Sequence, residues 1–121
     1  MSKRHQRLTG LFLEEITLAL RNVHGLNDKG ILTITGAELS GDDKTLDVFF
    51  SVLGAPEERD RKERILAANS REIRTILFKK LRLKAVPQIF FKFDETPQKA
   101  AHIEQLMDQI RSETNETDEN T

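Results

Sequence analysis

Apolar residues near the start of the chain follow a helical period. Between Leu8 and Val23 they recur at every third or fourth position, and charged residues such as Glu14 and Arg21 fill positions between them. This spacing predicts an amphipathic helix of about four or five turns. Gly25 lies just beyond it and suits a helix end, because glycine adopts the left-handed conformation without strain.

The pattern then changes to alternation, which is typical of half-buried strands. Leu32 and Ile34 share one face of the segment 31–39, and every second residue is apolar in the segment 46–52. Between these segments residues 40–43 read SGDD, a turn sequence. We therefore predict two antiparallel strands joined in a hairpin.

A long amphipathic segment follows at residues 56–81. Pro56 and the two acids after it suit the first turn of a helix. Polar residues interrupt the apolar stripe at Asn69 and Ser70, and such side chains compete with the helical backbone for hydrogen bonds. We predict two helical pieces that meet in a kink at Asn69, Ser70 and Arg71.

Alternation returns near the end of the chain. Ile89, Phe91 and Phe93 share one face of a third predicted strand, which a proline precedes at a position that strands tolerate. A short amphipathic helix is expected from about residue 97 to 111. Residues 112–121 hold four acids and no basic or apolar residue, so we expect this tail to be disordered.

These elements predict an α+β fold in the order helix, strand, strand, kinked helix, strand and short helix. Such a chain forms a three-stranded sheet with helices on one face. A long helix connects the second and third strands, so the pattern leaves open whether they are parallel or lie apart. By length the 121 residues form one domain, which we place at residues 1–111 with the acidic tail outside it.

The basic residues are concentrated between positions 59 and 84. This segment holds ten Lys and Arg residues against three acids, a net charge of +7 in a chain whose net charge is −1. A cationic face of this kind suits a polyanion, although an exposed helix can also carry many basic residues that bind nothing. We favour nucleic-acid binding through the residues clustered around the kink and the end of the helix, which are Arg71, Arg74, Lys79, Lys80, Arg82 and Lys84.

The expected binding mode is electrostatic. The chain has no Trp or Tyr, and its seven Phe residues fall mostly on the apolar stripes assigned to the core. We therefore expect recognition of phosphates and of RNA shape rather than base stacking. Such binding weakens steeply as salt is added.

Catalytic and metal-binding chemistry finds little support in the sequence. His5, His24 and His102 are scattered, and the chain has no cysteine, so the residues of a zinc site are not assembled. The six glycines are isolated and form no phosphate-binding loop. We expect no enzymatic activity, no cofactor and no metal. No window approaches the ~20 apolar residues of a membrane span, so we expect a cytoplasmic protein.

Several segments together resemble one protein family. They are the basic start of the first helix (Arg4, Arg7, Leu8), the hairpin ITGAELSGDDKTLDVFFSVLG, the segment IRTILFKKLRLKAVPQIFFKFDET, and the closing helix around Ile103 and Leu106. The most specific part is RLKAVPQIFFKFD. Up to about Arg111 the chain resembles bacterial ribosome-binding factor A, an assembly factor of the small ribosomal subunit.

The resemblance implies a KH-like domain of type II and a non-enzymatic, monomeric protein. Members of this family bind small-subunit rRNA on free subunits, assist late maturation and processing of the rRNA 5′ end, and matter most in the cold. The resemblance also implies that the six basic residues of the second helix contact RNA, together with Lys3, Arg4 and Arg7 beside the first helix.

This chain departs from the family pattern at two positions. The family builds its helical kink on Ala-x-Gly, whereas here the kink reads Asn69-Ser70-Arg71, with Arg71 at the glycine position. An arginine there hinders close approach of the RNA backbone but offers a phosphate contact. Gln88 stands where the family usually has an acid.

A second function remains open from the sequence. The basic helix could meet an acidic protein surface, which would make the chain an adaptor that docks on ribosomal proteins or on an assembly GTPase. Salt-dependent RNA binding by the isolated domain would separate the two functions.

Overall fold

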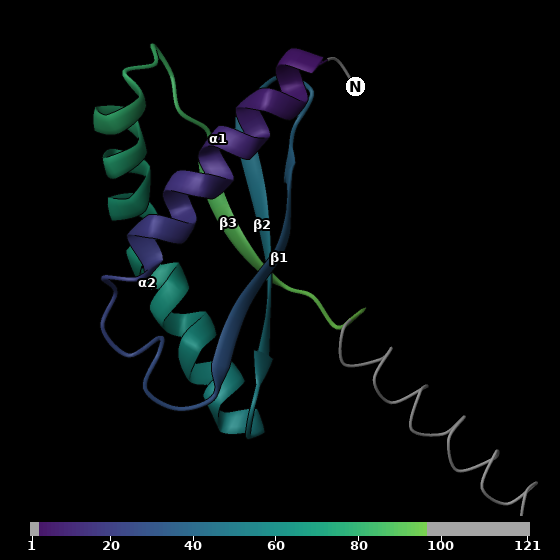
Figure 1. The fold of residues 1–121 in the computed structure, drawn as a ribbon, viewed down its shortest axis with the longest axis vertical. Helices are drawn as coiled ribbons and strands as arrows, with labels where there is room; N and C mark the ends of the chain where they lie inside the picture. The colour runs from purple at the N-terminus through teal and green to yellow at the C-terminus, as the bar shows by residue number, and fades with distance from the viewer. Residues whose placement is uncertain (1–2, 97–121) are drawn as a thin grey trace, which may run out of the picture.

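The computed structural model describes residues 3–96, which form two helices and a three-stranded sheet (Figure 1). In chain order the elements are α1 (Lys3–Leu20), β1 (Ile31–Leu39), β2 (Thr45–Leu53), α2 (Pro56–Leu81) and β3 (Gln88–Phe93). The order α-β-β-α-β is that of the predicted α+β, KH-like domain, so the fold prediction is confirmed. The predicted closing helix, the acidic tail and the domain boundary at residue 111 lie outside the described residues.

The sheet has the strand order β1-β2-β3, with β2 in the centre. β1 and β2 are antiparallel, as the hairpin signal predicts, and β2 and β3 are parallel. The parallel pairing answers the question that the sequence leaves open. α2 is therefore the crossover connection, and it returns the chain to the end of the sheet where β2 begins, so that Gln88 pairs with Thr45.

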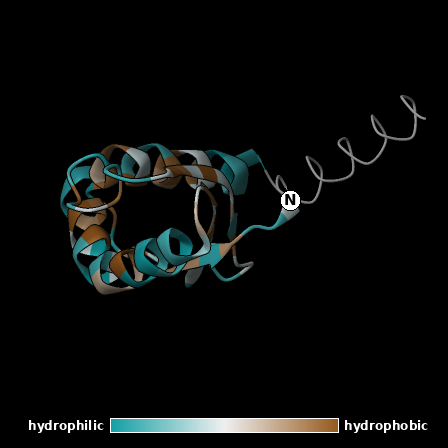
Figure 2. Ribbon diagram, turned by 90° about the horizontal axis from the view of Figure 1, so that it is seen from below, coloured by the Kyte–Doolittle hydropathy of each residue, from teal (hydrophilic) through white to brown (hydrophobic). Residues whose placement is uncertain are grey.

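Both helices pack against one face of the sheet. Figure 2 shows hydrophobic and hydrophilic residues alternating along the helices. Every second residue of β2, from Leu46 to Val52, is buried in the shared core. The helical residues that meet this face are Phe12, Ile16 and Leu20 from α1 and Leu66, Ile73 and Leu77 from α2.

A β-bulge changes which residues of β1 face the core. Ile34 pairs with Phe50, and the register then shifts before Gly36. The extra residue reverses the alternation, so that Ala37 and Leu39 point to the same side as Ile34, and Leu39 is buried. The simple alternation predicted for this strand therefore holds only up to the bulge.

The predicted break in the second helix is wrong. α2 runs without interruption from Pro56 to Leu81. The Asn69 side chain donates a hydrogen bond to the Ile65 carbonyl at 2.8 Å, and the Ser70 hydroxyl donates to the Ile89 carbonyl of β3 at 2.6 Å. Because both side chains find acceptors, neither has to end the helix.

The helix is bent instead of broken. Figure 1 shows that the two halves of α2 point in different directions. A side chain that hydrogen-bonds to the carbonyl four residues earlier, as Asn69 does, is a known cause of such bending. α2 ends at Leu81, and Arg82 caps it with a φ of 53°, the left-handed conformation common at helix ends.

A buried lysine joins the loop before β1 to the first turns of α2. Lys62 is fully buried, and its Nζ lies 3.6 Å from carboxylate oxygens of both Asp28 and Glu58. Arg61 hydrogen-bonds to the same two carboxylates. The hydrogen bond from Arg61 lowers the pKa of Asp28 to about 2.

Neither helix within residues 3–96 is long and apolar enough to cross a membrane.

We predict that Asp28→Asn makes folding stability less dependent on acid. The folded-state pKa of Asp28, about 2, lies below its unfolded value of about 4. Ionised Asp28 therefore stabilises the fold above pH ~4, and this stabilisation is lost as the pH falls from ~4 to ~2. Asp28→Asn should unfold at lower urea concentration at pH 7 and lose less stability than the parent across that window.

Urea unfolding followed by circular dichroism between pH 2 and 7 measures this effect. Asp60→Asn is the control, because Asp60 is exposed and forms no ion pair with another described residue. An identical acid dependence in the parent and in Asp28→Asn would show that the Asp28–Arg61 contact contributes nothing to folding.

Candidate nucleic-acid interface

One face of the second half of α2 is turned away from the core. Ile73 and Leu77 on its inner side are buried. The opposite side carries four exposed residues at spacings of three and four, which place them on one stripe. They are Arg71, Arg74, Thr75 and Phe78.

Two side chains of α2 hold this part of the helix beside β3. The Arg74 guanidinium donates two hydrogen bonds to the Val86 carbonyl, 3.2 Å from Nε and 3.0 Å from Nη2. Ser70 donates to the Ile89 carbonyl. Because β3 is an edge strand, an outward-facing carbonyl such as that of Ile89 would otherwise lack a partner from the sheet. Val86 lies in the segment just before β3. These contacts fix the position of the helix against the strand.

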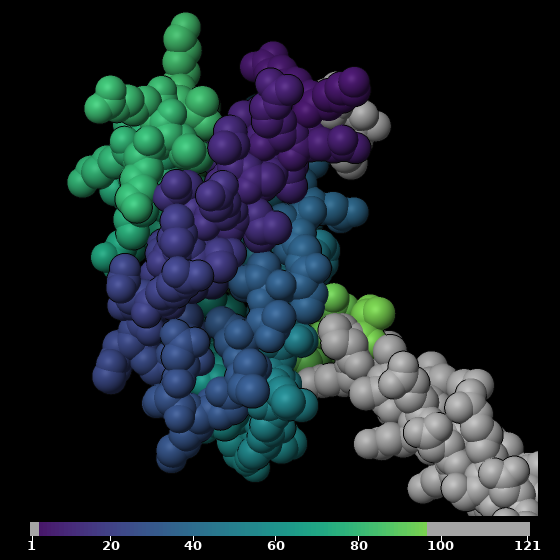
Figure 3. All heavy atoms as spheres, viewed as in Figure 1, coloured from purple at the N-terminus to yellow at the C-terminus, as the bar shows by residue number. Residues whose placement is uncertain are grey.

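Three adjoining hollows follow this junction, and Arg74 lines all of them. The largest, about 690 Å³, lies between the start of α1, the β1–β2 turn and residues 83–88. Figure 3 shows the notch between the start of α1, in purple, and the end of α2, in green. A second hollow of about 560 Å³ lies between α2 and β3, and a third of about 490 Å³ lies between Arg71, Phe78 and Lys84.

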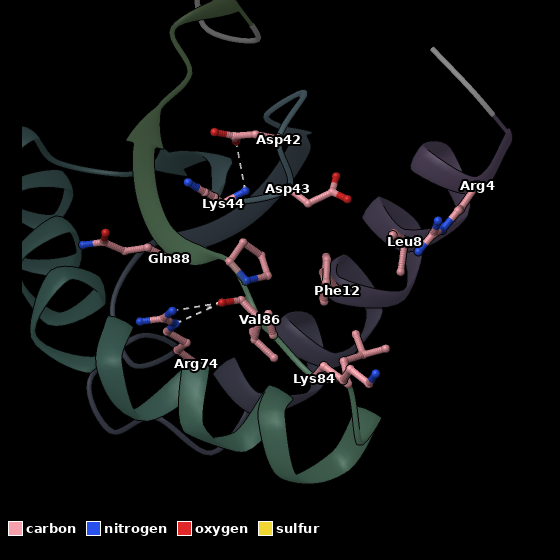
Figure 4. A pocket seen from close by; sticks show the side chains of 13 residues that line it. Arg4, Leu8, Phe12, Asp42, Asp43, Lys44, Arg74, Lys84, Val86 and Gln88 are labelled. Carbon is pink, nitrogen blue, oxygen red and sulfur yellow. Dashed lines mark hydrogen bonds between the residues drawn. The ribbon is translucent and has the colours of Figure 1, made fainter.

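We call these hollows together the basic groove. Six cationic side chains line it, which are Arg4, Lys44, Arg71, Arg74, Lys84 and Lys92. In Figure 4 the two hydrogen bonds join Arg74 to Val86, and Phe12 of α1 lies across the hollow from them. The elements that form the groove are thus far apart in the sequence.

The charge of the groove changes along its length. Asp42 and Asp43 line the largest hollow near the β1–β2 turn. Hydrogen bonds from the Ser40 hydroxyl and the Lys44 backbone N–H lower the pKa of Asp42, so this carboxylate is ionised at neutral pH. The described residues that line the other two hollows include no acid. An anion is therefore favoured most in the hollow that Arg71, Arg74 and Lys84 line together.

The structure brings together four of the nine predicted RNA-binding residues, namely Arg4, Arg71, Arg74 and Lys84. The other five do not line the groove. Lys80 approaches Glu15 of α1 at 3.6 Å, and Arg82 caps the end of α2. Lys79, Lys3 and Arg7 are exposed on the two helices. Of the predicted kink residues, Ser70 and Arg71 line the second hollow, whereas Asn69 bonds within α2.

Sequence reasoning missed four side chains that border the groove, which are Lys44, Phe78, Lys92 and Phe90. Lys44 and Lys92 lie outside the basic segment and reach the groove only through the folding of the sheet. Phe90 alternates with the buried Ile89, and Phe78 follows Arg74 by one helical turn. These two spacings were the sequence features that could have indicated that Phe90 and Phe78 border the groove.

No group of three or more metal-ligating side chains occurs within residues 3–96.

Comparison with known proteins identifies related sequences over nearly the whole chain. The family model described as Ribosome-binding factor A matches residues 4–107. A protein of that description from Opitutus terrae is 32% identical over 114 residues, which cover 94% of this chain and 93% of the relative.

Two solved structures share the fold. A Thermotoga maritima protein studied by solution NMR, a candidate ribosome binding factor A, is 34% identical with a TM-score of 0.55 and covers 73% of this chain and 80% of its own. Thermus thermophilus ribosome binding factor A, fitted into a cryo-electron microscopy map of a 30S complex, is 21% identical with a TM-score of 0.55. That match covers 79% of this chain and 97% of the other. At this identity the second likeness shows the fold alone.

We predict that Arg74→Met destabilises the domain, whereas Arg71→Met does not. Methionine keeps the apolar stem of the side chain but leaves the Val86 carbonyl without its charged donor, a loss of about 1 kcal/mol for a partly exposed bond. Arg71 is the matched control, because it lies one helical turn away and forms no hydrogen bond to another described residue through its side chain. Chemical denaturation measures both, and equal stabilities would contradict the structural role of Arg74.

Proposed function

Because this chain belongs to the ribosome-binding factor A family, we propose that it binds rRNA of an immature small ribosomal subunit through the basic groove. The supporting observation is that Arg71 and Arg74 of α2 and Lys84, just after the helix, line one hollow whose described lining includes no acid. Phosphates are the anions of RNA that such a lining attracts.

The three cations would act differently on the RNA backbone. Arg71 and Lys84 are exposed, so their side chains can change conformation to contact a phosphate. Arg74 is held in place by the Val86 carbonyl. A guanidinium has five N–H donors, so the donors that do not bind Val86 remain for a phosphate in a fixed orientation.

Arg71 gives this chain its own version of the site. It stands where the family usually has glycine, and it lines the hollows on both sides of Arg74. A glycine at this position would let the RNA backbone approach the helix closely. We propose that Arg71 instead binds an RNA phosphate through its charged side chain. Lys79, Lys80, Arg82, Lys3, Arg4 and Arg7 would add weaker attraction around this centre.

The family supports a role in small-subunit assembly. Its name describes ribosome binding, and its Thermus thermophilus member has been fitted into a map of a 30S complex. For this chain we propose a non-enzymatic factor that acts as a monomer, through one domain at residues 1–111, in late maturation and rRNA 5′-end processing, with the greatest need in the cold. The acidic tail at residues 112–121 is proposed to be dispensable.

We predict that reversing three groove charges weakens binding to small subunits and reduces its dependence on salt. In the variant Arg4→Glu, Arg71→Glu and Lys84→Glu, the affinity for 30S subunits or small-subunit rRNA should fall by at least about tenfold, and the slope of log affinity against log salt should become shallower, because fewer counterions are released. Co-sedimentation with subunits at several salt concentrations measures both quantities.

The matched control reverses three exposed charges outside the groove, Arg21→Glu, Lys29→Glu and Arg64→Glu. It changes the net charge equally and should bind nearly as the parent does. If both triple variants lose affinity alike, net charge and not the groove governs binding. Binding to subunits without any binding to rRNA would favour the adaptor function, with ribosomal proteins or an assembly GTPase as the partner.

A further inference from the structure

The two described helices leave one face of the sheet uncovered. They pack on the face that carries Phe50, and the alternation of β2 directs Phe49 and Leu53 to the opposite side, which we call the open face. Ile31 of β1 is paired with Leu53 and shares this face. Parallel sheets are usually covered on both faces, and β2 and β3 are parallel, so a second covering layer is expected here.

The open face is apolar where β1 begins and β2 ends. Leu53 is 69% exposed and Ile31 is 60% exposed, the highest values among the large hydrophobic side chains of residues 3–96. Single exposed apolar residues are ordinary in soluble proteins. These two are directly opposite each other on neighbouring strands, so their side chains are in contact range and form one apolar surface.

The chain leaves β3 on the open face. The Phe93 ring packs on the ring of Phe50 on the core side, so the next residue, Asp94, points to the other side of the sheet. Asp94 Oδ2 accepts a hydrogen bond from the Thr35 hydroxyl of β1 at 2.8 Å. Because β2 lies between β3 and β1, this bond places the end of the described chain across the open face.

Asp94 also makes the contact of a helix cap. Its Oδ1 accepts a hydrogen bond from the Thr96 backbone N–H at 3.0 Å, as an N-cap residue does from the second residue of a helix. Hydrogen bonds from Thr96 and from the Thr35 hydroxyl lower the pKa of Asp94, so the capping carboxylate is ionised at neutral pH. The segment for which the sequence predicts the closing helix is thus connected to the sheet at the open face.

We propose that the closing helix, residues 97–111, packs its apolar stripe on the open face, with Ile103 against Ile31 and Leu53. A helix of this length is only marginally stable alone in water, so it needs a surface on which to bury its stripe. The inference goes beyond the proposed function, because it concerns a part of the sheet away from the basic groove. The stripe consists of Ala100, Ile103, Leu106, Met107 and Ile110.

The position of the chain end selects Ile103 for this contact. β3 runs parallel to β2 with Phe93 level with Phe50, so a chain that continues in the same direction approaches Leu53. Leu53 follows Phe50 by three residues, about 10 Å along a strand. Ile103 follows Thr96 by seven residues, which is also about 10 Å along a helix. The two side chains are therefore expected at the same level of the sheet.

A segment of the same chain is a better occupant of this surface than a second copy of the protein. The connection through Asp94 holds the closing helix beside the surface at a high effective concentration. A second copy would lack this advantage, and a stable interface between two proteins needs about 800 Å² from each partner. One pair of apolar side chains supplies only a small part of that area.

A spin label in the full-length protein tests the position of the closing helix. The chain contains no cysteine, so a nitroxide on Lys29→Cys, close to Ile31 in the sequence, is the single label. It should broaden the amide NMR signals of residues 100–110. The same label on Glu14→Cys is the control, because Glu14 is exposed on α1, against the other face of the sheet, and should leave these signals sharp.

A double-mutant cycle tests the proposed contact itself. Leu53→Ala and Ile103→Ala should each lower the midpoint of urea unfolding. The double variant should unfold near the midpoint of the less stable single variant, because the second substitution removes a contact that is already lost. Gln105→Ala is the matched control on the polar side of the predicted helix, and its effect should add to that of Leu53→Ala.

The proposal is overturned if the label on Lys29→Cys leaves the signals of residues 100–110 sharp, or if both labels broaden them equally. Broadening that arises only between spin-labelled protein and a separate ¹⁵N-labelled copy would make a second molecule the occupant and would also overturn it. Fully additive effects of Leu53→Ala and Ile103→Ala would show that the two side chains are not in contact.

Discussion

The attachment of α2 to the free edge of β3 is the constraint on which the rest of this structure depends. A parallel pair of strands requires a crossover helix, and here Ser70 and Arg74 fasten that helix to the Ile89 and Val86 carbonyls. The contacts satisfy one backbone acceptor on the open edge of β3 and one in the segment that leads into it. They also set the position of α2 beside the strand, and the basic groove follows from that position.

The same attachment couples stability to recognition. Arg74 is at once a donor to the backbone and the residue common to the three groove hollows. Lys80 likewise contacts Glu15 across the helix pair. A variant at Arg74 therefore changes the fold and the groove together, whereas Arg71 and Lys84 contribute charge without such a contact among the described residues.

Local patterns predicted much of the fold and part of the site. Alternation in β2 placed Leu46, Val48 and Phe50 correctly in the core, because the period of a strand depends only on neighbouring residues. The break at Asn69 was predicted wrongly, since the acceptor that satisfies Ser70 lies on a strand 19 residues away. The general assignment of the phenylalanines to the core does not hold for Phe78 and Phe90, which are exposed. A helical stripe shows that a residue can face a core, and only packing shows whether it does.

The sequence by itself determined the order of elements, the hairpin, the buried face of each strand up to the bulge, and the strong positive charge of the segment 59–84. These properties follow from period, turn chemistry and composition, which are local. Only the tertiary structure decided that β3 pairs parallel to β2, that α2 stays continuous, and that Arg4 and Lys44 join Arg71, Arg74 and Lys84 in one groove. These depend on contacts between residues far apart in the chain, which no local pattern encodes.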